Sequence, residues 1–206
     1  MATTKATIAE QAMRILSGGH LKPDRNLDER EIMMYLDNLR DDLCKQSVYN
    51  IIKGGEYDID PDFLSQYMNV AIATDTDREL KYITLPASRI ALPKDMGIYL
   101  ITPMKNQGGA FIPIRAGQSW MYNNTATINA ESQTFYFPVG NKVYFQNIDP
   151  ALTVVLLTLV ASSKSILAND PFPIPPDYEK TMVDAIIERF GTAKQIPHDE
   201  IEDGNK

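Results

Sequence analysis

Three aspartates at alternate positions have the spacing in this chain that comes nearest to a metal site. Asp58, Asp60 and Asp62 share the D-x-D-x-D rhythm that opens a calcium-binding loop. Such a loop also needs a glycine at its sixth position and a bidentate glutamate at its twelfth, where this chain has Phe63 and Asn69. The pattern therefore favours solvated carboxylates at the start of a helix, and we expect no bound metal.

The histidines and the single cysteine suggest little acid-base or nucleophilic chemistry. His20 follows two glycines and His198 lies in an acidic stretch, and neither has an orienting carboxylate or a nucleophile at motif spacing. Cys44 falls within a helical pattern, which is typical of a small buried residue. Because the nucleophile-elbow, zincin, phosphate-loop and dinucleotide-binding patterns do not occur, we expect a protein that is not an enzyme and has no cofactor.

Composition narrows the class of protein further. The chain has 206 residues, of which 44% are hydrophobic and 23% charged, as in ordinary globular proteins. Its formal net charge of −7 argues against sequence-specific nucleic-acid binding, which needs clustered Lys and Arg. The most apolar run, residues 151–161, is shorter than the roughly 20 residues that cross a membrane, and the first residues lack a signal-peptide pattern. We expect no membrane role and synthesis in a cytoplasm.

Apolar residues at three- and four-residue spacing predict helices in the first third of the chain. Residues 7–17 form a short amphipathic pattern that ends at two glycines, and residues 27–53 form a long one that ends at Gly54. Asp60 and Pro61 open a third, shorter pattern through Phe63, Tyr67 and Val70. In the long helix the predicted inward residues are Ile32, Leu36, Leu39, Leu43 and Val48, and the outward ones are Arg30, Asp37, Asp41 and Lys45.

From Tyr82 onward, short segments are rich in β-branched and aromatic residues, and most are bounded by Pro, Gly or Asn. This pattern predicts strands. Gly140 and Asn141 fit a two-residue hairpin turn, and residues 107–109 fit a looser one. Residues 152–161 lack clean alternation, which suits either a strand buried on both faces or a core helix. The predicted strands are residues 82–85, 98–104, 111–115, 134–137, 143–146 and 152–161.

The C-terminal stretch changes character twice. Four prolines between residues 169 and 176 predict a stiff strap that runs extended over the surface. Asp177 is a predicted N-cap for an amphipathic helix that Gly191 would end. Beyond it, Ile196 and Ile201 are the apolar residues of an acidic tail that has too little apolar surface to order without a partner. The apolar stripe of the helix consists of Met182, Val183, Ile186, Ile187 and Phe190.

Together these patterns predict an α+β fold. It has N-terminal helices, one of them long, a central antiparallel β domain, and a C-terminal amphipathic helix followed by an extended tail. We expect residues 1–206 to form a single domain with extended ends. Its parts are a helical part at 1–73, a β part at 80–165, and the Pro-rich strap, helix and acidic tail at 169–206.

The C-terminal pattern, a strap ending in PIPPDYE, a helix and then PHDEIEDGNK, resembles that of small virion proteins of crAss-like and other short-tailed bacteriophages infecting Bacteroidetes. The resemblance extends in looser pattern to residues 22–46, KPDRNLDEREIMMYLDNLRDDLCKQ, and to the β-rich middle. It implies a structural protein in the virion that forms a ring in the head-to-tail connector, near the portal.

The resemblance also implies the partners. They are further copies of the chain, about twelve in a closed ring, the portal protein and other tail ring proteins. The net charge of −7 does not exclude a surface past which DNA slides, because an acidic wall repels phosphates, and whether DNA passes this chain is left open. We hypothesise that the tail and the helix at 7–17 are arms that order on assembly, while the long helix and the β domain form the ring body. The candidate interaction residues are Trp120, Ile196, Pro197 and Ile201, and for Trp120 packing in the core is an equal alternative.

Two alternatives belong to other classes. A soluble β-rich module that recognises a protein or a carbohydrate by its loops would be a stable monomer with a ligand pocket. A hydrolase would need paired carboxylates that the fold brings together from distant positions, which spacing along the chain does not reveal.

Overall fold

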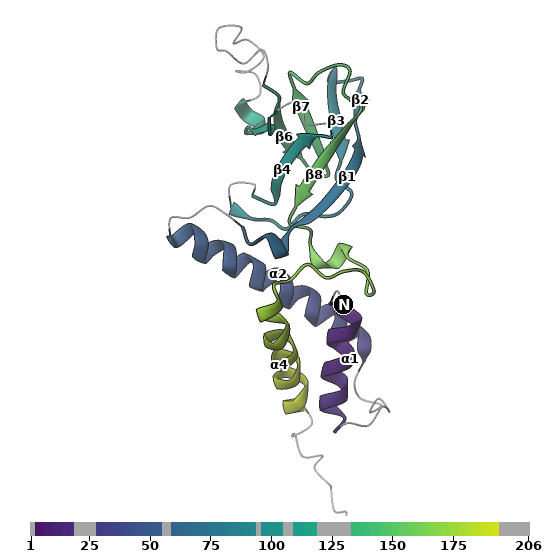
Figure 1. The fold of residues 1–206 in the computed structure, drawn as a ribbon, viewed down its shortest axis with the longest axis vertical. Helices are drawn as coiled ribbons and strands as arrows, with labels where there is room; N and C mark the ends of the chain where they lie inside the picture. The colour runs from purple at the N-terminus through teal and green to yellow at the C-terminus, as the bar shows by residue number, and fades with distance from the viewer. Residues whose placement is uncertain are drawn as a thin grey trace, which may run out of the picture. The chain divides into compact units, whose positions relative to one another are not determined.

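The computed structural model describes residues 3–18, 28–54, 59–93, 96–104, 109–118 and 133–193. Within them the fold is α+β, as predicted, with helices towards both ends of the chain and strands in between (Figure 1). The chain divides into two compact units. The helical unit comprises Met1–Ser47 and Ile166–Lys206, and the β unit comprises Val48–Ser165. The strap and the C-terminal helix therefore belong with the N-terminal helices, and the β unit is inserted between them in sequence.

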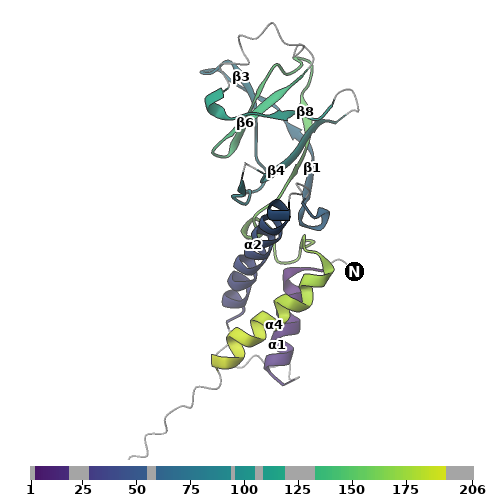
Figure 2. The same ribbon diagram turned by 90° about the vertical axis from the view of Figure 1, so that its left-hand side faces the viewer.

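Three helices supply the helical unit. α1 is Lys5–Leu16, α2 is Glu29–Gly54 and α4 is Pro176–Ala193. α1 begins with a capping box, in which the Thr4 hydroxyl accepts from the Thr7 backbone N–H and the Thr7 hydroxyl accepts from that of Thr4. α1 packs against α4, which Figure 2 shows from a second direction. The core of this unit consists of Ile8, Ala9, Ala12, Ile32, Leu36, Phe172, Ile174, Met182, Val183 and Ile186.

Two predictions for the ends of the chain are wrong. The first helix is not a separate arm, because Ile8, Ala9 and Ala12 have no exposed surface and lie in the core of the helical unit. The strap does not run over the surface throughout, because Phe172 and Ile174 are buried in the same core. Alternate residues of an extended segment point to opposite sides, so a Pro-rich strap can still bury one side.

The boundaries of α4 also differ from the predicted ones. The helix begins at Pro176, the position where a missing N–H costs least, so Asp177 lies in the first turn and not at the cap. The helix continues through Gly191 to Ala193. Gly191 does not end it because its φ is not positive, whereas a terminating glycine usually adopts the left-handed conformation.

The described strands of the β unit form two sheets (Figure 1). One has the order β1-β8-β4 and the other the order β2-β3-β7-β6-β5. The pairs are antiparallel apart from β5 with β6, which is parallel, so the second sheet is mixed. The strands are β1 (Ser65–Ala71), β2 (Ala73–Asp75), β3 (Leu80–Thr84), β4 (Ile98–Pro103), β5 (Ile112–Pro113), β6 (Phe135–Val139), β7 (Lys142–Gln146) and β8 (Val154–Leu159).

The core of the β unit takes residues from both sheets. β8 is the central strand of its sheet, and Val155, Leu157 and Leu159 on it have no exposed surface. This settles the ambiguous stretch at 152–161 as a strand. From the other sheet, Ile83, Val143 and Phe145 point into the same cluster, where Phe145 meets Phe111 edge to face with ring centroids 5.6 Å apart.

The third predicted helix is wrong. Asp60 and Pro61 do open a helical turn, but it is a 3-10 helix, η1 (Pro61–Phe63), and β1 follows it. Tyr67 and Val70 pair with Leu157 and Val155 of β8. Ladder hydrogen bonds to a distant strand override the local helical spacing, so the predicted helical part does not reach residue 73.

The hairpin predicted at Gly140 and Asn141 is confirmed. These two residues join β6 to β7, and Gly140 has a φ of 60°, which a glycine adopts without steric cost. The looser turn predicted at 107–109 lies largely outside the described residues. No helix in the part of the chain that the structure describes is long and apolar enough to cross a membrane.

Candidate interaction surfaces

The residues predicted to make interactions, Trp120, Ile196, Pro197 and Ile201, lie outside the residues that the structure describes, as do Asp58 and both histidines. Those predictions therefore stay predictions. Asp60 is described, and its carboxylate accepts from the Asp62 backbone N–H at 3.0 Å to cap η1. Across the described ranges, no three His, Cys, Asp or Glu side chains come close enough together to hold a metal ion.

A buried arginine that sequence reasoning missed holds the strap. The Nε and Nη2 atoms of Arg40 both donate to the carbonyl oxygen of Pro173, each at 3.1 Å, and Nη1 lies 3.3 Å from Asp41 Oδ1. The Arg40 side chain has no exposed surface, and burial lowers its pKa. A half-buried carbonyl in a proline-rich strap has few backbone N–H groups nearby, so the guanidinium supplies the donors.

The signal for Arg40 was present in the spacing. In the part of α2 that the structure describes, the buried residues recur at every fourth position. They are Ile32, Leu36, Arg40, Cys44 and Val48. The sequence interpretation placed Leu39 and Leu43 on the inward face instead, and these are half-buried. An arginine in the middle of an apolar stripe indicates a buried acceptor opposite it.

Lys5 makes a second set of contacts that connects segments of the helical unit. Its Nζ lies 2.6 Å from Asp37 Oδ1 and donates to the carbonyl oxygen of Ile166 at 2.7 Å, so it joins α1, α2 and the start of the strap segment. The Lys5 side chain is 5% exposed and that of Asp37 is 17% exposed, so Asp37 does not point into solvent as predicted. Backbone bonds from Phe172 to Thr3 and from Ala6 to Ala168 complete the attachment.

Cys44 behaves as predicted for a small core residue. It is fully buried and unbridged, and burial raises the pKa of its thiol to about 11. The raised pKa leaves little thiolate at neutral pH, so Cys44 is a weak nucleophile in the folded chain.

The β unit has a cleft of about 590 Å³ where the edge strands of its two sheets come together. The backbone N–H of Phe111 donates to the carbonyl oxygen of Ile101 at 2.9 Å, which joins β4 to the residue before β5. Tyr99, which is 39% exposed, lines the cleft together with the exposed Arg115. None of the described residues that line the cleft is acidic. The residues that line the cleft include Tyr99, Pro113, Arg115, Gln118, Tyr136 and Pro138.

The helical unit has a groove of about 520 Å³ between α2 and α4. Tyr35 lies across it, with its ring edge to face with Phe190 at 5.9 Å and the Arg189 guanidinium 4.7 Å above it. Met34, 66% exposed, lies on the rim with the carboxylates of Glu31 and Asp42. This groove is therefore acidic on one side, unlike the cleft of the β unit.

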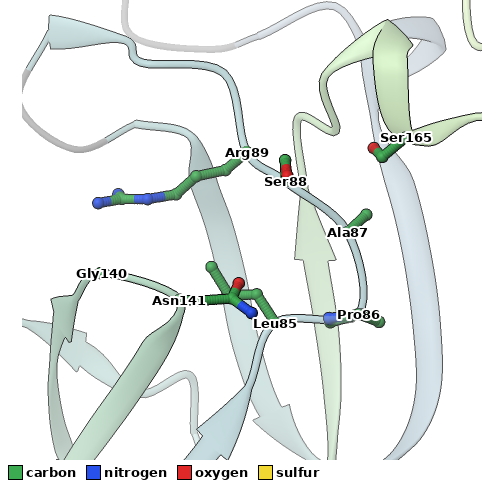
Figure 3. Close-up of a pocket in the computed structure, with 8 residues that line it drawn as sticks. All are labelled: Leu85, Pro86, Ala87, Ser88, Arg89, Gly140, Asn141 and Ser165. Carbon is green, nitrogen blue, oxygen red and sulfur yellow. The ribbon is translucent and has the colours of Figure 1, made fainter.

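A polar hollow lies beside the β6–β7 turn (Figure 3). Arg89 extends along one side of it and Ser165 lies on the other, with the Asn141 amide near Leu85 between them. The Asn141 carbonyl oxygen accepts from Leu85 N–H, and the Ser165 hydroxyl donates to the Ser162 carbonyl oxygen. These bonds hold the loop in place, and the residues that line the hollow offer neither a carboxylate nor an imidazole for catalysis.

A hydrogen-bonded carboxylate fastens the β2–β3 hairpin to β7. Tyr144 donates its hydroxyl to Asp75 Oδ2 at 2.9 Å, which lowers the pKa of Asp75. Burial, and then this hydrogen bond, raise the pKa of Tyr144. The Arg78 guanidinium lies 4.9 Å above the Tyr144 ring, and Lys142 Nζ lies 4.1 Å above the Tyr82 ring. The rings are already covered by cations, so this cluster stabilises the sheet instead of offering a free stacking surface.

The fold and these surfaces define an α+β protein with a helical unit and a two-sheet β unit, each with its own concave surface. Comparison with protein-family models and with curated proteins gives no match to this chain.

Proposed function

We propose that the chain is a structural virion protein that forms an oligomeric ring in the portal-proximal head-to-tail connector of a short-tailed bacteriophage. The resemblance of the strap, helix and acidic tail supports this role. The observation that carries the proposal is the attachment of that same segment, since Arg40 and Lys5 hold it to the helical unit through contacts at Pro173 and Ile166. A tail that follows a fixed helix has a defined starting point from which to reach a neighbouring copy.

The division into two units suits a protein that lies between two other layers. α2 begins in the helical unit and ends in the β unit, because the boundary between the units falls at Ser47 and Val48. Each unit has its own core and its own concave surface. A ring needs two different surfaces on each copy, and a connector needs further surfaces for the layers above and below.

The acidic balance fits a surface past which DNA moves. A net charge of −7 repels phosphates, so DNA would not be held during passage. The ring role needs no catalytic group, and the buried thiol of Cys44 and the capping carboxylate of Asp60 have structural tasks.

Quantitative mass spectrometry of purified virions tests the proposal. We expect the chain at a low copy number in a fixed ratio to the portal protein, far below the major capsid protein. A second assay mixes the purified chain with portal protein and images the product by electron microscopy, where a ring on one portal face is expected. Absence of the chain from virions would remove the ring role.

A soluble β-rich binding module is the second candidate, and the cleft at β4 and β5 is the observation that favours it. It predicts a monomer at all concentrations, with a ligand in that cleft and no association with portal protein. Light scattering of the chain with and without portal protein separates the two roles.

A further inference from the structure

We propose that the cleft at the edges of β4 and β5 binds the acidic segment at residues 194–206 of another copy of this chain. The inference rests on the proposed function in one respect, which is that several copies lie side by side. The inference specifies which surface of one copy binds which segment of another, and the ring role by itself does not.

The charge of the cleft matches this occupant. Arg115 is exposed, lines the cleft and makes no ion pair with a described residue, and no described residue of the lining is acidic. The segment at 194–206 has four acidic residues, Asp199, Glu200, Glu202 and Asp203, against two lysines. A guanidinium at the rim of an apolar cleft pairs well with a carboxylate that follows an apolar residue.

The apolar part of the cleft matches as well. Tyr99 and Pro113 are exposed beside the half-buried Pro138, and they form a surface for a short apolar side chain and a proline ring. In the segment, Ile196 comes three residues before Asp199 and Pro197 comes two residues before it. In an extended peptide at about 3.3 Å per residue, Ile196 and Asp199 lie roughly 10 Å apart, which lets one occupy the apolar part while the other reaches the rim.

The groove of the helical unit is the less suitable receptor. Glu31 and Asp42 lie on its rim, and Arg189 is already placed over the Tyr35 ring. An acidic segment there would meet like charges, which disfavour binding. The cleft of the β unit is therefore the better receptor for the segment at residues 194–206.

The first test is a binding assay with a fluorescent peptide of residues 194–206 and the full chain, read by anisotropy. We expect saturable binding that weakens as salt is raised, because the ion pair is exposed. Arg115→Glu should weaken binding at least about tenfold, since it replaces attraction by repulsion. Lys164→Glu makes the same charge change at another exposed position of the β unit, so it should leave binding unchanged. Circular dichroism checks that both variants are folded.

Peptide variants test the two parts of the contact separately. Ile196→Ser in the peptide should weaken binding without changing its salt dependence. Replacement of the four acidic residues by their amides should weaken binding and abolish the salt dependence. A peptide that does not bind the parent chain, or that binds Arg115→Glu as tightly as the parent, would overturn the assignment of the cleft.

A complementation experiment shows whether the contact joins two copies. One full-length variant has an inactive cleft, Arg115→Glu, and the other has an inactive segment, Ile196→Ser with Ile201→Ser. Each alone should be monomeric by light scattering, and their mixture should contain heterodimers, because one intact cleft meets one intact segment. If the peptide binds but the mixture stays monomeric, the segment of one full-length chain does not bind the cleft of another, and the contact between copies is wrong.

The outcome for the cleft is separable from the outcome for the ring. A chain present in virions whose cleft does not bind the peptide retains the ring role and loses this inference. A chain absent from virions whose cleft does bind the peptide retains the contact between cleft and segment and loses the ring role.

Discussion

The helical unit and the β unit are held together in different ways. In the helical unit, the fully buried Arg40 and the nearly buried Lys5 join segments from both ends of the chain. In the β unit, the central cluster consists of apolar and aromatic residues on two facing sheets. A unit assembled from distant segments gains a defined docking position from directional hydrogen bonds, whereas paired strands already have their register set by the ladder.

The largest effect should come from Arg40→Ala. It leaves the Pro173 carbonyl oxygen without these two donors and removes one partner of Asp41, so we expect a loss of about 3–5 kcal/mol in the free energy of unfolding. Urea unfolding followed by circular dichroism measures the loss. Arg14→Ala, which removes an exposed pair with Glu10, is the matched control and should change stability by less than about 0.5 kcal/mol.

The same pair of variants shows whether the contact between Arg40 and Pro173 stabilises the helical unit alone. Hydrogen exchange should rise in α1, α4 and the strap of Arg40→Ala more than in the strands. Unchanged stability of Arg40→Ala would mean that the strap is held by its apolar contacts alone, and the contrast between the two units would then be wrong.

Leu157→Ala should destabilise the β unit, whose core consists of apolar contacts. Leu157 has no exposed surface and lies on the central strand β8, so the change leaves a cavity between the sheets. We expect a loss of about 2–4 kcal/mol. Hydrogen exchange should rise first in β1, β4 and β8, which is the reverse of the Arg40→Ala pattern. The conservative change Leu157→Met should cost less than about 1.5 kcal/mol, and equal losses for the two variants would contradict a close-packed core.

Cys44 reports on the core of the helical unit without perturbing it. Its thiol pKa is raised from 9.0 to about 11, so near pH 8 the folded chain holds about a hundredfold less thiolate than the unfolded one. We expect labelling by iodoacetamide to be slower by at least that factor in the folded chain, and to speed up in Arg40→Ala. Labelling of the folded parent at the unfolded rate would show that this core opens freely.

The smallest effect concerns pH and the β unit. The folded pKa of Asp75 lies below its ordinary value because Tyr144 donates to it, so the folded state favours the carboxylate. The stability from this contact is therefore present above the unfolded pKa near 3.8 and is lost as the pH falls through the folded pKa. Asp75→Asn should flatten this acid-side dependence in thermal unfolding, while Asp77→Asn, at an exposed position nearby, should leave it. An unchanged profile in Asp75→Asn would assign the dependence to other carboxylates.

Local patterns predicted most of the elements but not their partners. The helices at 7–17 and 27–53 and the turn at Gly140 depend on nearby residues, and they were predicted to within a few positions. Residues 60–70 were predicted as a helix because Phe63, Tyr67 and Val70 have helical spacing, yet the decisive contact is with β8, far along the chain. Spacing does not contain that information, because a long-range ladder forms only once both strands exist.

The candidate surfaces were predictable to a smaller extent. The cleft at Tyr99 and Arg115 arises where two sheet edges meet, and no local signal marks it. Arg40 did have a local signal, its position in an apolar stripe, but its acceptor at Pro173 comes from the other end of the chain.

The sequence by itself determined the α+β class, the long helix, the β6–β7 hairpin and the acidic balance, because these follow from residue types and short-range periodicity. Only the tertiary structure decided that the strap returns to the N-terminal helices, that residues 65–71 become a strand, and that Arg40 is buried. Each of these depends on a contact between residues far apart in the chain, and the free energy of such a contact is realised only when the whole unit packs.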